Sequence, residues 1–284
     1  MDRSGARSIV LGLIRHRSGL VGAVLVAVIV ASGVLAPLLT PFDPDEIQMA
    51  EALEPPGWSH PLGTDAFGRD VASRVLFGAR FSLQVSVLSR LIAIALGTLL
   101  GLVAGYFGGR VDSVVMRLAD VTLAYPGLLL LIAVIAAVGP SMAALFIALG
   151  VVGWAGVARL VRAQVLSIKE REFVLAIRSL GAPHQRVLVH HVLPNVFTQL
   201  MVIFSMGLGA AIMAESSMSF LGLGAQPPTA SWGSMISSGL DYLRVAPWLS
   251  LAPGFVITLT VLGFNLLGDA LRDVLDPKLG GGRR

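Results

Sequence analysis

Long apolar runs with few or no charges, separated by short polar stretches, dominate this chain from residue 18 onward. The runs cover about residues 20–39, 84–107, 121–138, 142–158, 196–214 and 248–268. Runs of this length are typical of membrane-spanning helices, because only a helix satisfies its own backbone hydrogen bonds in lipid. The pattern therefore predicts an all-α polytopic membrane protein with six transmembrane helices.

The third and fourth spans are predicted from one uncharged stretch. Asp120 and Arg159 bracket 38 uncharged residues, which are too many for one span and enough for two. Gly139-Pro140-Ser141 supplies the turn between the spans, because proline and glycine interrupt helices. Tyr125-Pro126, near the start of the third span, is a position at which that helix can kink.

The second span carries Gly97, Gly101 and Gly105 at intervals of four. Small residues at this spacing form a groove that lets another helix approach closely. We expect this groove to serve helix packing within the fold in preference to a dedicated dimer face.

Two polar loops are predicted on one side of the membrane, at 40–83 and 215–247. The first loop is rich in proline, and seven of the seventeen acidic residues lie between positions 43 and 80. Residues 71–90 are compatible with a helix along the membrane interface. Glu215 opens the second loop, and we expect it either to line a pathway or to pair with an arginine of the first loop.

The N-terminal arm, residues 1–17, carries four arginines before the first apolar run. A basic arm followed by an apolar run also fits a secretory signal peptide. A retained first span is favoured, because the run is long for such a peptide and Pro37 occupies the place of a small cleavage-site residue.

Positive charge indicates the orientation. The N-terminal arm, the turn at 110–117, the stretch 159–195 and the C-terminal end hold 16 of the 21 lysines and arginines. These four segments fall on one face if six spans alternate. Both termini and residues 159–195 are therefore expected in the cytoplasm, with 18–284 forming a single domain.

Composition and motifs argue against several other functions. Only 13% of residues are charged, against about 25% in soluble domains, and the net charge of +4 gives no reason to expect nucleic-acid binding. The chain has no cysteine to join His184, His190 and His191 in a metal site. It also lacks a nucleophile motif and a phosphate-binding glycine-rich loop. We expect no enzymatic activity and no bound cofactor.

The cytoplasmic stretch 159–195 predicts two short helices around a turn. Phe173–Leu180 has apolar residues at helical spacing. Gly181 suits a left-handed C-terminal cap, and Pro183 suits the first turn of the next helix, which Pro194 is expected to end. A short amphipathic helix needs a groove on a partner or a membrane surface, and the pattern leaves both open.

This stretch resembles the cytoplasmic loop of the inner-membrane permeases of ATP-binding-cassette importers. That loop carries Glu-Ala-Ala, three residues, Gly and a spaced Leu-Pro, and it docks the ATPase subunit. Aligned on Gly181 and Leu193-Pro194, this chain has Leu175-Ala176-Ile177 in place of Glu-Ala-Ala. The acid is therefore absent, with Glu170 and Glu172 nearby. The resemblance implies the following coupling residues: Ala176, Ile177, Leu180, Gly181, Ala182, Pro183, Leu193 and Pro194.

Further blocks are similar to the C-type permeases of the dipeptide/oligopeptide/nickel group. They are Leu62–Asp70 with Ser73-Arg74 and Gly78–Leu83, Glu215–Gly224 with Pro227–Gly233, and Asn265–Asp273 with Asp276-Pro277. Together with the cytoplasmic stretch they extend from the first loop to the end of the chain. Residues of these blocks are candidates for contact with the transport pathway or a binding protein: Asp65, Arg69, Asp70, Glu215, Ser216, Ser219 and Trp232.

The resemblance implies a type I importer permease in the bacterial cytoplasmic membrane that moves peptides inward. It implies a second homologous permease chain, two ATPase subunits that bind ATP and Mg, and an extracytoplasmic solute-binding protein. Nickel or another small solute is an alternative cargo. A secondary transporter and a membrane scaffold are alternatives from other classes. A secondary transporter should show an ionisable residue inside the spans for ion coupling, and the span centres contain none.

Overall fold

The computed structural model describes residues 12–13 and 16–275 of the 284-residue chain. Most of the predicted N-terminal arm, with Arg3, Arg7 and Arg15, lies outside the described residues. The same holds for the C-terminal residues from Asp276 onward.

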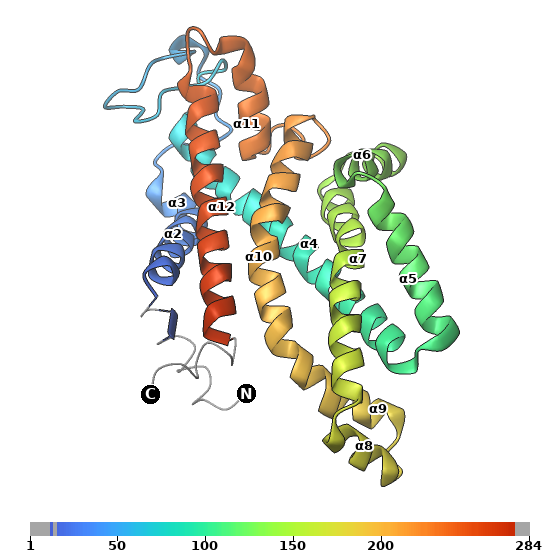
Figure 1. The fold of residues 1–284 in the computed structure, drawn as a ribbon. Coiled ribbons are helices and arrows are strands. Elements are labelled where there is room, and N and C mark those ends of the chain that lie inside the picture. Colours follow the sequence, from blue (N-terminus) through green and yellow to red (C-terminus); the bar gives the residue numbers. More distant parts are fainter. Residues whose placement is uncertain (1–11, 14–15, 276–284) are drawn as a thin grey trace. The chain divides into compact units, whose positions relative to one another are not determined.

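The regular elements of the described part are helices, and an isolated β-bridge pairs Thr64 with Asp70 (Figure 1). The helices in chain order are α2 (Arg17–Val34), α3 (Ala36–Leu39), η1 (Met49–Glu51), α4 (Val71–Phe107), α5 (Gly109–Ala124), α6 (Gly127–Val138), α7 (Met142–Lys169), α8 (Glu172–Ser179), α9 (His184–Val187), η2 (Leu188–Val192), α10 (Leu193–Phe220), α11 (Trp232–Gly239), η3 (Leu240–Tyr242) and α12 (Trp248–Leu275). The prediction of an all-α fold is confirmed.

Five helices of the described part are long and apolar enough to cross a membrane. They are α2, α4, α7, the continuous helix His184–Phe220 and α12, and α5 with α6 would make a sixth. Helix α4 has 37 residues and a length of roughly 55 Å, whereas the hydrocarbon layer is about 30 Å thick. The predicted interface helix at 71–90 is therefore the first part of one long helix that must tilt or project beyond the hydrocarbon.

The stretch predicted as a third span, 121–138, is divided between two helices. Helix α5 ends at Ala124, Tyr125 adopts an extended conformation, and α6 begins at Gly127 with a bend of 95°. Proline disfavours helical geometry in the residue before it, so Pro126 explains the extended Tyr125. The sequence predicted where this helix is interrupted, but it did not predict the 95° angle of the bend.

The chain divides into two compact units. Unit 1 comprises Met1–Val87, Ile135–Phe146 and Ser205–Arg284. Within it α2 lies along α12 (Figure 1). Their backbones approach closely at Gly22, where an added Cβ would lie 2.6 Å from the nitrogen of Leu267. Glycine at this point therefore sets the separation of the two helices.

Unit 2 comprises Leu88–Val134 and Ile147–Phe204. Here the glycines of α4 receive the β-branched side chains of α7. A Cβ at Gly101 would lie 2.8 Å from the Cβ of Val161, and one at Gly105 would lie 2.8 Å from the Cβ of Val165. The prediction that this groove serves packing within the fold is confirmed.

Candidate functional site

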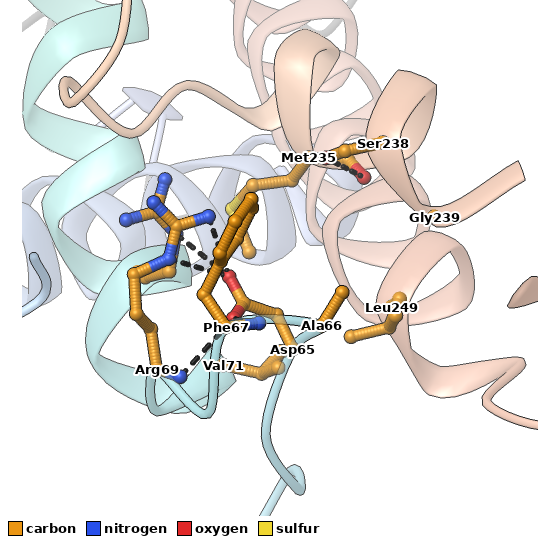
Figure 2. A pocket seen from close by; sticks show the side chains of 10 residues that line it. Asp65, Ala66, Phe67, Arg69, Val71, Met235, Ser238, Gly239 and Leu249 are labelled. Carbon is orange, nitrogen blue, oxygen red and sulfur yellow. Dashed lines mark hydrogen bonds and ion pairs between the residues drawn. The ribbon is translucent and has the colours of Figure 1, made fainter. Parts of the chain in front are cut away.

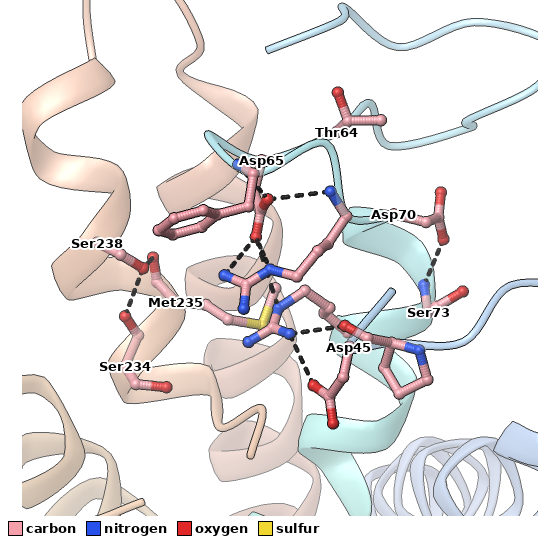
Figure 3. A network of polar contacts seen from close by, with 12 residues as sticks. Asp45, Thr64, Asp65, Asp70, Ser73, Ser234, Met235 and Ser238 are labelled. Atoms are coloured by element: carbon pink, nitrogen blue, oxygen red, sulfur yellow. Dashed lines mark hydrogen bonds and ion pairs between the residues drawn. The ribbon is translucent and has the colours of Figure 1, made fainter. Parts of the chain in front are cut away.

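The loop that precedes α4 in unit 1 is held by a buried histidine. His60 is 5% exposed, with Nδ1 2.8 Å from Asp70 Oδ1 and Nε2 3.2 Å from Glu51 Oε2. Burial lowers the pKa of His60, but Asp70 and Glu51 together outweigh burial and raise it above its usual 6.5. Asp70 also accepts a hydrogen bond from the backbone N–H of Ser73 (Figure 3), which caps the start of α4.

A chain of alternating charges continues from this loop into α4 (Figure 3). Asp65 pairs with Arg69 at 2.7 Å and lies 3.7 Å from Arg74 Nε. Arg74 donates to Asp45 at 3.1 Å and to the carbonyl of Pro44 at 2.6 Å. The predicted contact residues Asp65 and Arg69 therefore come together, and each satisfies the charge of the other.

The cavity beside this network is small. It has a volume of about 30 Å³ and lies between the loop and α11, with Asp65, Phe67 and Arg69 on one side and Met235 and Ser238 on the other (Figure 2). The guanidinium carbon of Arg69 lies 4.8 Å from the ring centroid of Phe67. A space of this size admits a water molecule or two and excludes a peptide.

Glu215 is fully buried in α10 of unit 1. Its carboxylate accepts hydrogen bonds from Ser219 Oγ at 2.7 Å and from Ser216 Oγ at 3.4 Å. The hydroxyl of Ser82 interacts with this carboxyl without hydrogen-bond geometry. Glu215 forms no ion pair with any described residue, so the expected pairing with an arginine of the first loop is wrong. Instead, the side chains of Ser82, Ser216 and Ser219 surround its carboxylate.

Trp232 is also fully buried, at the start of α11. Its indole N–H donates to the carbonyl of Val75 at 2.9 Å, and the ring packs on Gly78, where a Cβ would approach within 3.1 Å. Ser231 caps α11 through a capping box with Ser234. Trp232 thus joins α11 to α4, and its ring offers no surface to a partner in this conformation.

The cytoplasmic stretch lies in unit 2, and its first part belongs to a longer helix than expected. Helix α7 extends to Lys169, so Arg159 and Arg162 lie on it and pair with Asp120 and Asp112 of α5. Ion pairs between neighbouring helices fix their register, although exposed pairs contribute little to stability. The part that lies free of α7 is therefore shorter, from Glu170 onward.

The predicted turn around Gly181 is present. Helix α8 ends at Ser179, and Gly181 follows with a φ of +79°, so the left-handed cap is confirmed. The Gly181 N–H bonds to the carbonyl of Arg178. Pro183 is the N-cap of α9 and thus stands one position before the first turn in which it was expected.

Pro194 does not end the second helix, contrary to the prediction. The helix continues from His184 to Phe220, and the π-helical turn η2 immediately precedes Leu193-Pro194. Proline inside an α-helix clashes with the carbonyl four residues earlier, and a wider turn removes that clash. Asn195 donates its side-chain amide to the His191 carbonyl at 2.7 Å, which gives that carbonyl a partner.

Helix α8 has a buried face and an exposed apolar face. Val174 is fully buried, and Ile177 packs against the same core. By contrast Leu175 is 43% exposed and Leu180 is 86% exposed, with Ala176 also exposed. Ala176 and Leu180 are one helical turn apart, so these exposed apolar side chains are neighbours and are available to a partner surface.

The end of α4 is attached to this stretch by contacts that the sequence did not indicate. Tyr106 is 9% exposed, and its hydroxyl lies 2.9 Å from His184 Nδ1. Arg178 lies over the Tyr106 ring at 5.9 Å, and Lys169 donates to the carbonyl of Gly105 at 3.1 Å. These contacts connect α8 and α9 to the end of α4.

Comparison with known proteins gives matches over most of the chain. Residues 97–281 match the family described as binding-protein-dependent transport system inner membrane component. Residues 7–56 match the family described as the N-terminal TM domain of oligopeptide transport permease C.

Curated relatives match over nearly their full lengths. A dipeptide transport system permease protein of Alkalihalophilus pseudofirmus is 42% identical over 265 residues, which cover 93% of this chain and 87% of the relative. An oligopeptide transport system permease protein of Bacillus subtilis is 38% identical over 270 residues, covering 94% and 88%. A glutathione transport system permease protein of Pectobacterium atrosepticum is 41% identical over 267 residues, covering 94% and 89%.

Proposed function

This chain belongs to the binding-protein-dependent transport system inner membrane components, and from this membership we propose that it is the permease subunit of an ATP-driven importer of dipeptides and oligopeptides. The proposal is supported by the relatives, two of which carry dipeptide or oligopeptide transport in their names. It is also supported by the five to six candidate spans among residues 12–13 and 16–275, the part of the chain that the structure describes.

The proposed importer requires partner proteins, because this chain lacks a phosphate-binding loop for ATP. A second homologous permease chain completes the pathway, two ATPase subunits bind ATP and Mg, and an extracytoplasmic binding protein delivers the cargo. Both termini and the segment Glu170–Pro194 lie in the cytoplasm, in keeping with the distribution of positive charge. This chain supplies no catalysis.

The single observation that carries the coupling role is the exposed apolar face of α8. Leu180, 86% exposed, and Ala176 would dock in a groove of an ATPase subunit. Closure of the ATPase pair on ATP would move α8 and, through Tyr106, the end of α4. Access would then alternate between the two sides, because ATP stabilises one of two conformations.

The test is co-purification of the ATPase subunits with a tagged permease. Leu180→Glu places a charge in the proposed groove and is expected to abolish or strongly reduce ATPase recovery and stimulated ATP hydrolysis. Leu243→Glu is the matched control, because Leu243 is also an exposed leucine, 46% exposed, and follows η3 in unit 1. Equal recovery of ATPase with both variants would refute the docking role.

The cargo is tested separately in cells that depend on this transporter. Uptake of labelled dipeptides and oligopeptides that requires ATP and the binding protein supports the proposal. Uptake of nickel with no peptide uptake would assign the alternative cargo.

A further inference from the structure

A second recess in unit 1 is lined by groups of opposite charge and by apolar side chains. Its volume is about 290 Å³, and its walls come from α4, the loop that precedes it, the loop before α11 and the start of α7. Phe77 and Met142 supply apolar surface. The volume is close to the lower end of the range for small-molecule pockets, roughly 300–1,000 Å³.

Arg80 is the cation of this recess. Among the described residues no carboxylate lies in ion-pair contact with it, whereas Arg69 and Arg74 both have carboxylate partners. Its side chain is exposed on α4, and Gln84 follows one turn later on the same face. A guanidinium is always charged and matches a carboxylate with two parallel hydrogen bonds.

Asp45 supplies the opposite charge. Its side chain is 41% exposed and keeps free acceptor capacity beyond its contact with Arg74 at 3.1 Å. Asp45 and Arg80 line the same recess. A cation and an anion thus line one space, and this pair of charges complements a zwitterion.

We propose that this recess is a cargo subsite that binds a short peptide with two free ends. Arg80 holds the C-terminal carboxylate, and Asp45 faces the N-terminal ammonium. The inference rests on the proposed peptide cargo and adds to it a direct contact between cargo and this chain. The volume restricts the part that is bound to about two residues.

Protection of an introduced thiol tests this subsite in the assembled transporter, because the chain has no cysteine of its own. Thr229 is exposed and lines the recess, so Thr229→Cys reports on its occupancy. Dialanine at about ten times its dissociation constant is expected to slow labelling of this cysteine by about tenfold, because the free fraction of the site falls to about one tenth. Dialanine amide at the same concentration lacks the carboxylate, so it should bind about tenfold more weakly and slow labelling only about twofold.

A second substitution ties the protection to Arg80. Arg80→Gln in the Thr229→Cys chain is expected to reduce protection by dialanine to the level of dialanine amide. Leu240→Cys, an exposed position outside the recess, serves as the control and should label at the same rate with and without peptide. Equal protection by the two peptides, or protection unchanged by Arg80→Gln, would overturn the proposal.

Uptake of labelled dialanine by the transporter that keeps Thr229 distinguishes failure of the subsite from failure of the proposed peptide cargo. If dialanine is imported but does not protect Thr229→Cys, the subsite is refuted and the peptide cargo stands. If dialanine protects through Arg80 but no peptide is imported, the subsite is supported and the proposed cargo fails. If neither occurs, both are refuted.

Discussion

Substitution of Gly181 separates the shape of the coupling turn from its contacts. Gly181 has a φ of +79°, and a Cβ added there would meet no atom within 4 Å. An alanine would therefore clash with nothing, and its whole cost would be the left-handed backbone, about 1–2 kcal/mol. Valine is branched at Cβ and should cost more.

This strain is released if the turn leaves the left-handed conformation, which would redirect α8. We expect the docking-competent conformation to lose the same 1–2 kcal/mol, so that affinity for the ATPase subunit falls by a factor of about 5–30. Gly156→Ala is the matched control, because Gly156 also has open space but lies inside α7. There alanine should be neutral or stabilise the helix by about 0.5–1 kcal/mol.

The assay is the equilibrium affinity of the ATPase subunit for the permease pair in lipid nanodiscs, together with ATP-driven peptide uptake. Gly181→Ala should weaken binding and uptake, Gly181→Val should weaken both further, and Gly156→Ala should leave both unchanged. Wild-type affinity and uptake in Gly181→Val would refute the reasoning, since a strained or redirected α8 could not then be part of the docking surface.

Three further outcomes are expected. Tyr106→Phe removes the hydroxyl that contacts His184, and loss of this hydrogen bond should destabilise the contact by about 1 kcal/mol. Peptide uptake should then fall more than ATP hydrolysis, and an unchanged amount of peptide transported per ATP would contradict this prediction. Gly101→Ala brings a Cβ within 2.6 Å of the Ala158 carbonyl and should lower thermal stability by about 1–3 kcal/mol, whereas an unchanged melting temperature would show that the helices separate freely. The raised pKa of His60 means that its contribution to loop stability is complete below pH 6.5 and is lost as pH rises through the folded-state value. Hydrogen exchange of residues 48–70 should therefore speed up with pH beyond its intrinsic dependence, and His60→Gln should abolish this excess.

Features governed by local rules were predictable from the sequence. A left-handed Gly181 was expected because it follows an amphipathic helix and stands two residues before Pro183, and the structure has it at a positive φ. The four-residue spacing of Gly97, Gly101 and Gly105 foretold close helix packing, and the structure fills that groove with valines of the same chain. In both cases a few neighbouring residues determine the outcome.

Features that depend on distant parts of the chain were not predictable. Tyr106 and His184 are 78 positions apart, and neither has a sequence context that points to the other. Pro194 was expected to end a helix, because the local rule does not foresee a π turn that accommodates its ring. An arginine partner was one of two expectations for Glu215, whereas tertiary packing surrounds it with serines.

The corner between α5 and α6 has a consequence for whatever surrounds this chain. Pro126 has no N–H to offer the Thr122 carbonyl, and the 95° bend leaves the first N–H groups of α6 without helical partners. Lipid tails cannot solvate such groups, so bare backbone of this kind is tolerated at membrane depth only against protein or water. Wherever the corner lies within the hydrocarbon layer, a neighbouring subunit or an aqueous passage must therefore cover it.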